Sequence, residues 1–230
     1  MGGEREARDP RSGGVADETL LRQSAAGDNA AFRLLFDRYE PLLSRFFVRV
    51  LSSREDAEEA VADTFLKLWR SASTFRAEAT VRTWLFRIAN HTAIDVLRRR
   101  QRQPVVDTSV PPVADGEVRP GEDTELANPE AALVAGYQRE RDHHALRLAL
   151  AQLEPSERTL VALYYFEGCS YAQIREITGG SQARLKSRLH RARQRLKVHF
   201  VRLRDSDEDL EMLAHPSADS TVDPRRLLGL

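Results

Sequence analysis

The sequence has a single cysteine, Cys169, among its 230 residues. One thiol cannot form an internal disulfide, so nothing indicates an oxidising compartment. The sequence also lacks an apolar run of roughly eighteen residues, the minimum for a membrane-spanning helix. Residues 1–16 have no apolar segment of the kind found in secretory signals. We therefore expect a cytoplasmic protein with no membrane insertion.

The sequence also lacks a net charge: its 35 Lys and Arg residues are balanced by 35 Asp and Glu residues, so the formal net charge is zero. The charges are nevertheless unevenly distributed along the chain. Residues 104–128 hold six acidic side chains against Arg119 alone, whereas Tyr171–Arg204 holds ten Lys and Arg against Glu176 alone. A neutral total therefore does not exclude a basic surface that binds nucleic acid.

Motifs for catalysis are absent too. The sequence contains no Walker loop, no G-x-G-x-x-G, no H-E-x-x-H and no nucleophile elbow. His143 and His144 are adjacent, so on a helix they point about 100° apart and cannot easily hold one metal ion. With Cys169 as the only thiol, a zinc site is not expected. We predict no enzyme, no metal and no cofactor.

Alternating β patterns are also lacking, and apolar residues recur at steps of three and four, which predicts an all-α fold. The 41% of hydrophobic residues suffices for real cores. We expect two small helical domains joined by a flexible linker. The predicted segments are a disordered N-terminus at 1–16, a first domain at 17–103, an acidic Pro-rich linker at 104–128, a second domain at 129–204 and a tail at 205–230.

Helix boundaries follow from capping residues and from proline. Pro41 lies inside an apolar helical pattern, so we expect a kink or a break there, whereas Pro155 suits the first turn of a helix. Side-chain caps are predicted at six positions: Asp17, Asp28, Ser53, Thr80, Ser170 and Ser181. The last two caps flank a turn at Gly179 and Gly180, which predicts a helix-turn-helix.

The second helix of this motif is basic around its apolar stripe, which suits a helix lying in the major groove of DNA. Residues in its first turns are candidates for base contacts, and those further along for phosphate contacts. The candidates are Gln182, Arg184, Lys186 and Ser187 for bases, and Arg188, Arg191 and Arg195 for phosphates. A solvated basic helix without a nucleic-acid partner is the alternative.

The segment Phe75–Arg102 mixes aromatic and basic residues, a combination that suits stacking on unpaired bases. Its candidate residues for DNA are Phe75, Arg76, Arg82, Trp84, Arg87, Asn90, His91, Arg98 and Arg99. Trp84 could instead be a core residue. A third cluster joins acidic and apolar side chains and could dock a basic partner protein: Asp56, Glu59, Asp63, Phe65, Leu68 and Trp69. An acidic first helical turn has the helix dipole as a simpler explanation.

Two sets of motifs, in order, resemble bacterial extracytoplasmic-function (ECF) sigma factors of RNA polymerase. Region 2 of that family is similar to DAEEAVADTFLKLWR at 56–70, FRAEATVRTWLFRIA at 75–89 and AIDVLRRR at 93–100. Region 4 is similar to LEPSERTLVALYYFEGCSYAQI at 153–174 and KSRLHRARQRLK at 186–197. The resemblance covers about 25–103 and 130–200, which is most of the chain.

The resemblance implies a role for each segment. The acidic helix would bind the clamp helices of the largest subunit of core RNA polymerase. The 75–102 segment would melt and hold the start-proximal (−10) promoter element, and the helix-turn-helix would read the upstream (−35) element as a duplex. It also implies an anti-sigma factor as a partner and action at the nucleoid. A stand-alone helix-turn-helix regulator is the alternative, but it would need a dimerisation or ligand domain that the first half does not suggest.

The sequence departs from the family pattern at several positions. The family usually has Asn where His91 stands and a small residue where Arg175 stands. It has an apolar residue in place of Gly180 and a Gly-Thr-Val-like run at residues 183–185, where this chain has Ala, Arg and Leu. We expect Gly180 to remove a side chain that packs the two helices together.

Overall fold

The computed structural model describes residues 15–102 and 141–205, and both parts are built from helices, with no strand in either. The predicted N-terminal segment before residue 15, the linker, the beginning of the second domain and the tail beyond residue 205 lie outside the described residues. The first part contains α1 (Asp17–Ala25), α2 (Asn29–Leu51), α3 (Arg54–Ser71), the short 3₁₀ turn η1 (Ala72–Thr74) and α4 (Val81–Arg102).

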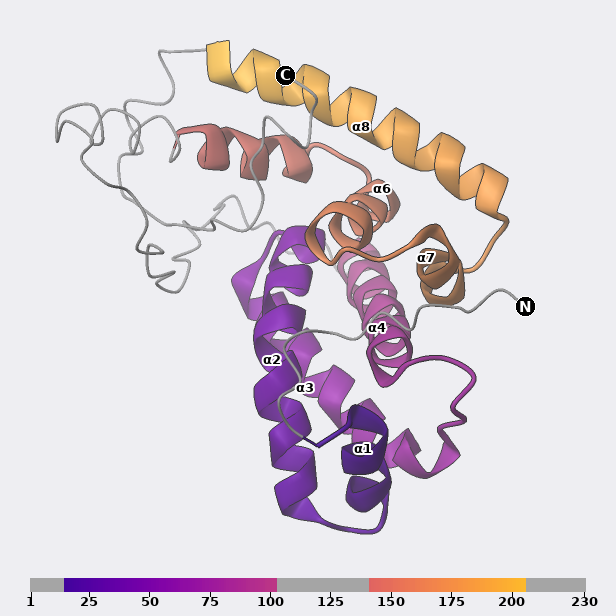
Figure 1. Cartoon of the computed structure of the whole chain (residues 1–230). Coiled ribbons are helices and arrows are strands. Elements are labelled where there is room, and N and C mark those ends of the chain that lie inside the picture. Colours follow the sequence, from indigo (N-terminus) through magenta and orange to yellow (C-terminus); the bar gives the residue numbers. More distant parts are fainter. Residues whose placement is uncertain (1–14, 103–140, 206–230) are drawn as a thin grey trace, which may run out of the picture.

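The N-terminal domain is a bundle in which α2 packs against α1, α3 and α4 (Figure 1). Leu35, Leu43, Phe46 and Phe47 on α2 are completely buried, and their spacing of three, four and eight residues places them on one helix face. The Phe46 ring meets the Phe86 ring of α4 edge to face, with centroids 5.4 Å apart. This aromatic contact lies where α2 and α4 cross, so it fixes α4 relative to the rest of the bundle.

The expected break at Pro41 does not occur, because α2 is one helix from Asn29 to Leu51. Pro41 is exposed. The carbonyl group that loses its hydrogen-bond partner there belongs to Asp37, which is exposed too, so water can satisfy it. Burial of the opposite face of α2 then holds the helix together across the proline.

Most of the predicted caps are confirmed. The Asp28 carboxylate accepts from the backbone N–H groups of Ala30 and Ala31, at 2.8 and 3.1 Å. Ser53 and Thr80 accept in the same way at the starts of α3 and α4. The prediction for Asp17 is wrong: α1 begins after Ala16 without a side-chain cap.

Asp17 instead ties the first helix to the second. Its carboxylate accepts hydrogen bonds from the Arg38 guanidinium and from the Tyr39 hydroxyl on α2. Burial, and then the Asp17 carboxylate, raise the pKa of Tyr39, so the hydroxyl remains a donor across the physiological range. The sequence shows Asp17 only as a residue before a helix, and its partners lie 21 and 22 residues further along the chain.

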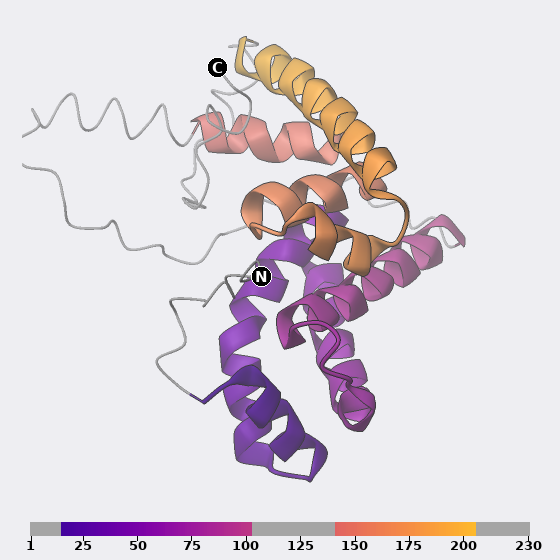
Figure 2. The same ribbon diagram turned by 45° about the vertical axis from the view of Figure 1, so that its right-hand side comes forward.

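The C-terminal domain contains a helix that covers residues 141–151, followed by α6 (Pro155–Val161), the π-helical turn η2 (Ala162–Phe166), α7 (Tyr171–Thr178) and α8 (Gln182–Asp205). The long helix α8 runs beside the helix at 141–151 in both views (Figures 1 and 2) and packs against α6. Leu196 and Phe200 of α8 are fully buried. Pro155 occupies the first turn of α6, as predicted.

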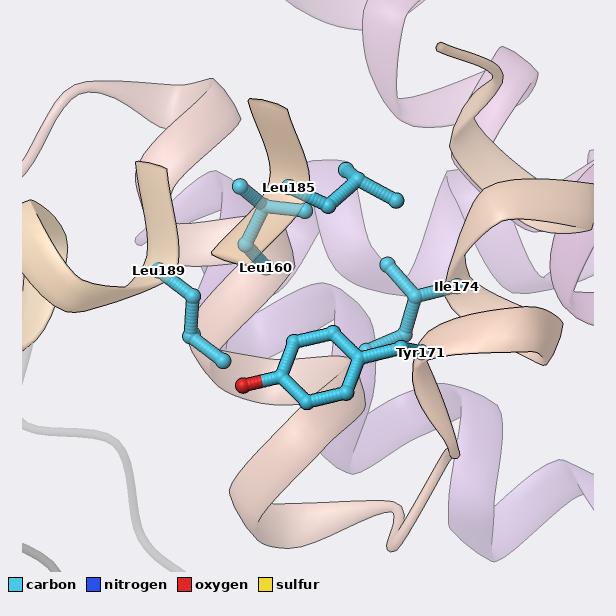
Figure 3. A pocket seen from close by; sticks show the side chains of 5 residues that line it. All are labelled: Leu160, Tyr171, Ile174, Leu185 and Leu189. Carbon is cyan, nitrogen blue, oxygen red and sulfur yellow. The ribbon is translucent and has the colours of Figure 1, made fainter. Parts of the chain in front are cut away.

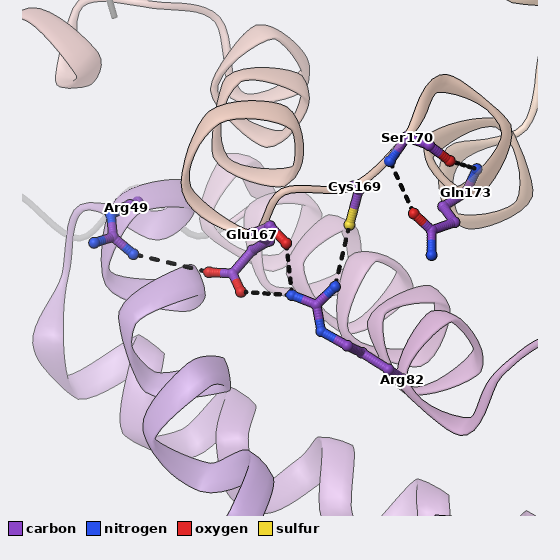
Figure 4. Close-up of polar contacts among 6 residues, drawn as sticks. All are labelled: Arg49, Arg82, Glu167, Cys169, Ser170 and Gln173. Carbon is purple, nitrogen blue, oxygen red and sulfur yellow. Dashed lines mark hydrogen bonds and ion pairs between the residues drawn. The ribbon is translucent and has the colours of Figure 1, made fainter. Parts of the chain in front are cut away.

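The wide turn η2 was not predicted. The N–H group of Glu167 donates to the carbonyl oxygen of Ala162 at 3.0 Å, five residues back, and that of Cys169 donates to the carbonyl oxygen of Leu163 at 2.9 Å. Gly168 follows with a φ of 64°, a left-handed conformation that suits glycine. The turn redirects the chain between α6 and α7, and it places Glu167 and Cys169 on the side that faces the N-terminal domain (Figure 4).

We predict that Asp28→Ala lowers the free energy of unfolding by about 1 kcal/mol, because it removes the cap of α2. Urea denaturation followed by circular dichroism measures the change. Asp37→Ala is a matched control, since Asp37 is an exposed carboxylate in the interior of the same helix and should change stability by less than about 0.5 kcal/mol. Equal effects of the two substitutions would contradict the capping role.

Candidate nucleic-acid interface

Helices α7 and α8 form the predicted helix-turn-helix. Ser170 caps α7 in a capping box: its hydroxyl accepts from the backbone N–H of Gln173, and the Gln173 side chain accepts from the backbone N–H of Ser170 at 2.8 Å. Ser181 lies before α8 and accepts from the Arg184 backbone N–H at 3.5 Å. Both helix starts are therefore fixed by side chains that the sequence alone identified.

Packing of α6, α7 and α8 orients the second helix. Apolar side chains from the three helices converge around a shallow hollow (Figure 3), lined by Leu160, Tyr171, Ile174, Leu185 and Leu189. Ile174, Leu185 and Leu189 are nearly fully buried. At the rim, the Lys186 ammonium lies 5.6 Å from the centre of the Tyr171 ring, within the range of a cation–π contact. One face of α8 is thus anchored, and its other face is free for a ligand.

The structure offers another reason for Gly180 than the expected loss of a packing side chain. Gly180 is exposed, and a Cβ atom added there would meet nothing within 4 Å, so it would enter open space and add no contact between the helices. Gly180 has a φ of 92° and Gly179 a φ of 76°, so both adopt conformations that L side chains rarely take. The two glycines are therefore required by the turn, which joins α7 to α8 through a left-handed backbone.

The predicted base-contacting residues are all accessible at the start of α8. Gln182, Arg184, Lys186 and Ser187 are all exposed in its first two turns. Of the predicted phosphate contacts, Arg191 is exposed and Arg188 is half-buried. Arg195 is exposed and forms an ion pair with Glu157 of α6 at 3.0 Å. The seven candidates therefore share one helix and one accessible surface, about four turns long.

The second predicted cluster, on Phe75–Arg102, is divided by the structure. Phe75 and Trp84 are half-buried, and their rings pack 5.1 Å apart. Trp84 was predicted either as a DNA contact or as a core residue. Its side chain packs against the core and remains partly exposed to solvent. The exposed members of the cluster are Arg76, Arg87, His91, Arg98 and Arg99.

Two members of this cluster contact the C-terminal domain. Arg82 donates to the backbone carbonyl oxygen of Glu167 at 2.7 Å and pairs with its carboxylate at 3.3 Å. Asn90 is buried, and its side-chain amide donates to the carbonyl oxygen of Ile177 in α7 at 3.4 Å. Sequence reasoning found Arg82 and Asn90 but missed Glu167, which has no motif of its own and follows an ordinary aromatic run.

The acidic cluster on α3 lies beside the basic end of α4. Asp56 forms an ion pair with Arg100, and Glu59 pairs with Arg99 at 2.9 Å. The Glu59 carboxylate raises the pKa of Arg99 through this hydrogen bond. Asp63, the third acidic candidate, is half-buried. The acidic face is accessible, although part of its charge is balanced within the domain.

The apolar part of this cluster needs correction. Phe65 and Leu68 have exposed fractions of 3% and 1%, so they belong to the core and cannot offer a surface. Their spacing relative to Val61 is that of a buried stripe. Trp69 is 36% exposed and packs edge to face on Phe32 at 4.8 Å. Leu66, which the sequence places in the same apolar run, is 46% exposed, and two exposed apolar side chains of α2 were not anticipated as surface residues: Leu34 and Phe36. Leu34 falls outside the buried stripe of α2, which is the signal that could have revealed it.

No group of three His, Cys, Asp or Glu side chains within residues 15–102 and 141–205 is placed to hold a metal ion. In the same ranges, no helix is both long and apolar enough to cross a bilayer.

The fold and the exposed face of α8 define a two-domain helical protein with a DNA-binding helix-turn-helix. Comparison with known proteins agrees. Residues 35–103 match the family model for Sigma-70 region 2, and residues 143–196 match that for Sigma-70 region 4. The chain is 30% identical over 180 residues to RNA polymerase sigma-H factor of Pseudomonas aeruginosa, covering 77% of this chain and 90% of that protein. It is 33% identical over 182 residues to ECF RNA polymerase sigma factor SigM of Mycobacterium tuberculosis, covering 79% and 83%.

Solved structures show the same fold. The sigma factor RpoE of Bartonella quintana, solved in complex with the anti-sigma factor NepR, matches with a TM-score of 0.54 and 25% identity over 74% of this chain and 96% of that one. CnrH, solved with the cytosolic domain of CnrY, matches in fold with a TM-score of 0.54 and 24% identity, over 80% and 96%. The chain belongs to the ECF family of RNA polymerase sigma factors. It is a transcription initiation factor that binds core polymerase and promoter DNA, and the stand-alone regulator is not favoured.

We predict that Gly180→Ala lowers the free energy of unfolding by about 1 kcal/mol, because alanine is strained at a φ of 92°. Gly180→Asn is the matched variant and should cost less, since asparagine adopts left-handed conformations more readily. Thermal or urea denaturation measures both. A more stable alanine variant would show that the position lacks a side chain for packing, as the family pattern had suggested.

Proposed function

We propose that the two domains divide promoter recognition, so that α8 reads the upstream element as a duplex and the 75–102 segment holds the start-proximal element as a single strand. The observation that carries the proposal is the two-sided character of α8. Its apolar side is buried against α6 and α7, and around the rest of the helix six of the seven candidate residues are exposed and Arg188 is half-buried. The chain would act by binding alone, without catalysis, in the cytoplasm at the nucleoid.

Recognition by α8 follows from its geometry. The N-terminal turns of a recognition helix approach base edges, so Gln182, Arg184 and Lys186 are placed for direct readout. Arginines further along the helix reach phosphates on the groove walls and fix its register. The Arg195 side chain is 57% exposed and that of its partner Glu157 only 13%, so a phosphate would compete with the Glu157 carboxylate for the open side of the Arg195 guanidinium.

The start-proximal element would lie along α4 and the loop before it. Exposed arginines there can neutralise the backbone of an unpaired strand, and the half-buried Phe75–Trp84 pair can stack on a base. His91, in the position where the family has Asn, is exposed on the same helix and retains a ring that can donate or accept hydrogen bonds.

Core polymerase would bind the α2–α3 side of the N-terminal domain. Acidic Asp56 and Glu59 lie on the same helix as the exposed apolar residues Leu66 and Trp69. Clusters of exposed apolar side chains rimmed by charge are characteristic of protein interfaces. We further propose that an anti-sigma factor is a partner of this chain. The support is that RpoE of Bartonella quintana, a sigma factor of the same fold, was crystallised together with the anti-sigma factor NepR.

Salt dependence tests the phosphate contacts. Replacing both Arg188 and Arg191 with alanine should weaken promoter binding and reduce the slope of log K against log salt by about 2, one unit for each contact. Fluorescence anisotropy at several salt concentrations measures the slope. The control variant replaces Arg22 and Arg33, exposed residues of α1 and α2 in the N-terminal domain, and should leave the slope unchanged. The same slope in both variants would rule out the contacts.

Run-off transcription with core polymerase tests the function itself. The chain should produce start sites that core enzyme alone does not use. Reversing Asp56 and Glu59 to lysine should lower the yield about tenfold at limiting protein, because the basic surface of polymerase would then face lysines in place of carboxylates. Glu55→Lys with Glu58→Lys, on the same helix and with the same change of charge, is the control. No initiation by the unmodified chain would refute the proposed function.

A further inference from the structure

Helix α8 is longer than the part that the proposed function uses. The candidate base contacts end at Ser187 and the candidate phosphate contacts at Arg195, whereas the helix continues to Asp205. From Arg191 to the end of the helix is an axial length of about 21 Å. The outer side of this part faces away from the other helices in both views (Figures 1 and 2). It is therefore accessible to a second ligand.

The outer side of this part of α8 carries two cations and one apolar side chain. Arg191 and Arg195 are exposed. Val198 is 64% exposed, the largest value among the large hydrophobic side chains in the described parts of the chain. The steps of four and three residues place Arg191, Arg195 and Val198 on the same side of the helix. We call these three residues the distal surface of α8.

The sequence just after α8 complements the distal surface. Residues 207–211, beyond the described part of the chain, read D-E-D-L-E, which is four carboxylates around Leu210 with no cation. Opposite charges and an apolar residue thus occur in both sets. The acidic residues of the 104–128 segment are sparser, with six in 25 positions. Charge complementarity of this kind favours a specific contact between the two sets.

The tail is long enough to return along the helix. The axial distance from Asp205 back to Val198 is about 10 Å, and back to Arg195 about 15 Å. An extended chain spans up to roughly 3.3 Å per residue. Leu210 can therefore reach Val198, and Glu211 can reach Arg195. Because the tail is attached to the end of α8, its effective concentration at the distal surface is high.

We propose that the acidic segment 207–211 docks on the distal surface of α8, with carboxylates at Arg191 and Arg195 and with Leu210 at Val198. Each of these contacts is exposed and therefore weak, and attachment to the same helix makes them sufficient together. The consequence for DNA rests on the proposed function. Phosphates and the tail would compete for Arg191 and Arg195, so the tail lowers the affinity for duplex DNA of any sequence, while the base-reading turns stay uncovered.

Cross-linking tests the docking without DNA. The chain has three lysines, Lys67, Lys186 and Lys197, and Lys197 directly precedes Val198. A water-soluble carbodiimide couples a lysine amine to a carboxylate in contact with it. In the monomeric full-length chain at low salt, Lys197 should become joined to a carboxylate of residues 207–211, as peptide mapping by mass spectrometry would show. Lys67, whose ammonium lies 3.5 Å from the Asp95 carboxylate, is the internal positive control.

A change on the helix side tests the role of charge. Arg191→Gln should lower the yield of the Lys197 cross-link at least about twofold, because one exposed ion pair is lost. Arg184→Gln removes an exposed cation from the first turn of the same helix and is the matched control. It should leave the yield unchanged, and an equal loss in both variants would contradict docking at the distal surface.

Duplex binding provides the second readout. Asp207→Asn together with Asp209→Asn should bind a promoter duplex about threefold more tightly at low salt, and the difference should narrow as salt rises, because exposed charges are screened. Asp219→Asn together with Asp223→Asn makes the same change of charge further along the tail. This control should bind like the unmodified chain. An equal gain in both variants would indicate general repulsion between tail and DNA and would overturn the docking.

The two assays separate this proposal from the proposed function. A Lys197 cross-link with unchanged duplex binding would retain the docking but remove Arg191 and Arg195 from the DNA contacts. The docking would be overturned if Lys67 joins Asp95 while Lys197 joins no carboxylate of residues 207–211. A cross-link from Lys197 to the 104–128 segment instead, or to a second copy of the chain, would overturn it as well.

Discussion

Burial of the Glu167 carboxylate determines how the two domains are placed. A carboxylate removed from water is tolerated only where cations and donors replace its hydration, and Arg49 and Arg82 provide this from the other domain. The π-helical turn before Glu167 brings it to that position. Separation of the domains would rehydrate all three charges, so the boundary can open without leaving a buried charge unpaired. A contact of this kind suits a reversible arrangement.

Each long helix divides its surface between the core and a partner. On α8 the apolar face meets α6, and the basic face is left for DNA. On α3 the stripe that includes Phe65 enters the core, and acidic residues with Trp69 stay outside. The net charge of the chain is zero because the positive charges of basic segments such as α8 are balanced by the negative charges of acidic segments such as the start of α3.

Much of the local structure could be predicted because it depends on neighbours in sequence. The caps at Asp28, Ser53 and Ser170 involve residues two or three positions away, so they follow from the sequence pattern. Predictions failed where the partner is distant. Asp17 binds Arg38 and Tyr39 instead of capping its helix. Phe65 and Leu68 were included in the docking cluster although their spacing from Val61 is that of a buried stripe, and they are buried.

The sequence by itself determined the all-helical fold, the helix-turn-helix and the two sets of sigma-factor motifs. These depend on apolar periodicity, on capping and on short runs of residues, all of which are local. Only the tertiary structure decided that Glu167 meets Arg82 and Arg49, residues 85 or more positions away, and that Asn90 lies beneath α7. Contacts between domains depend on how complete surfaces fit together, and no local pattern records that fit.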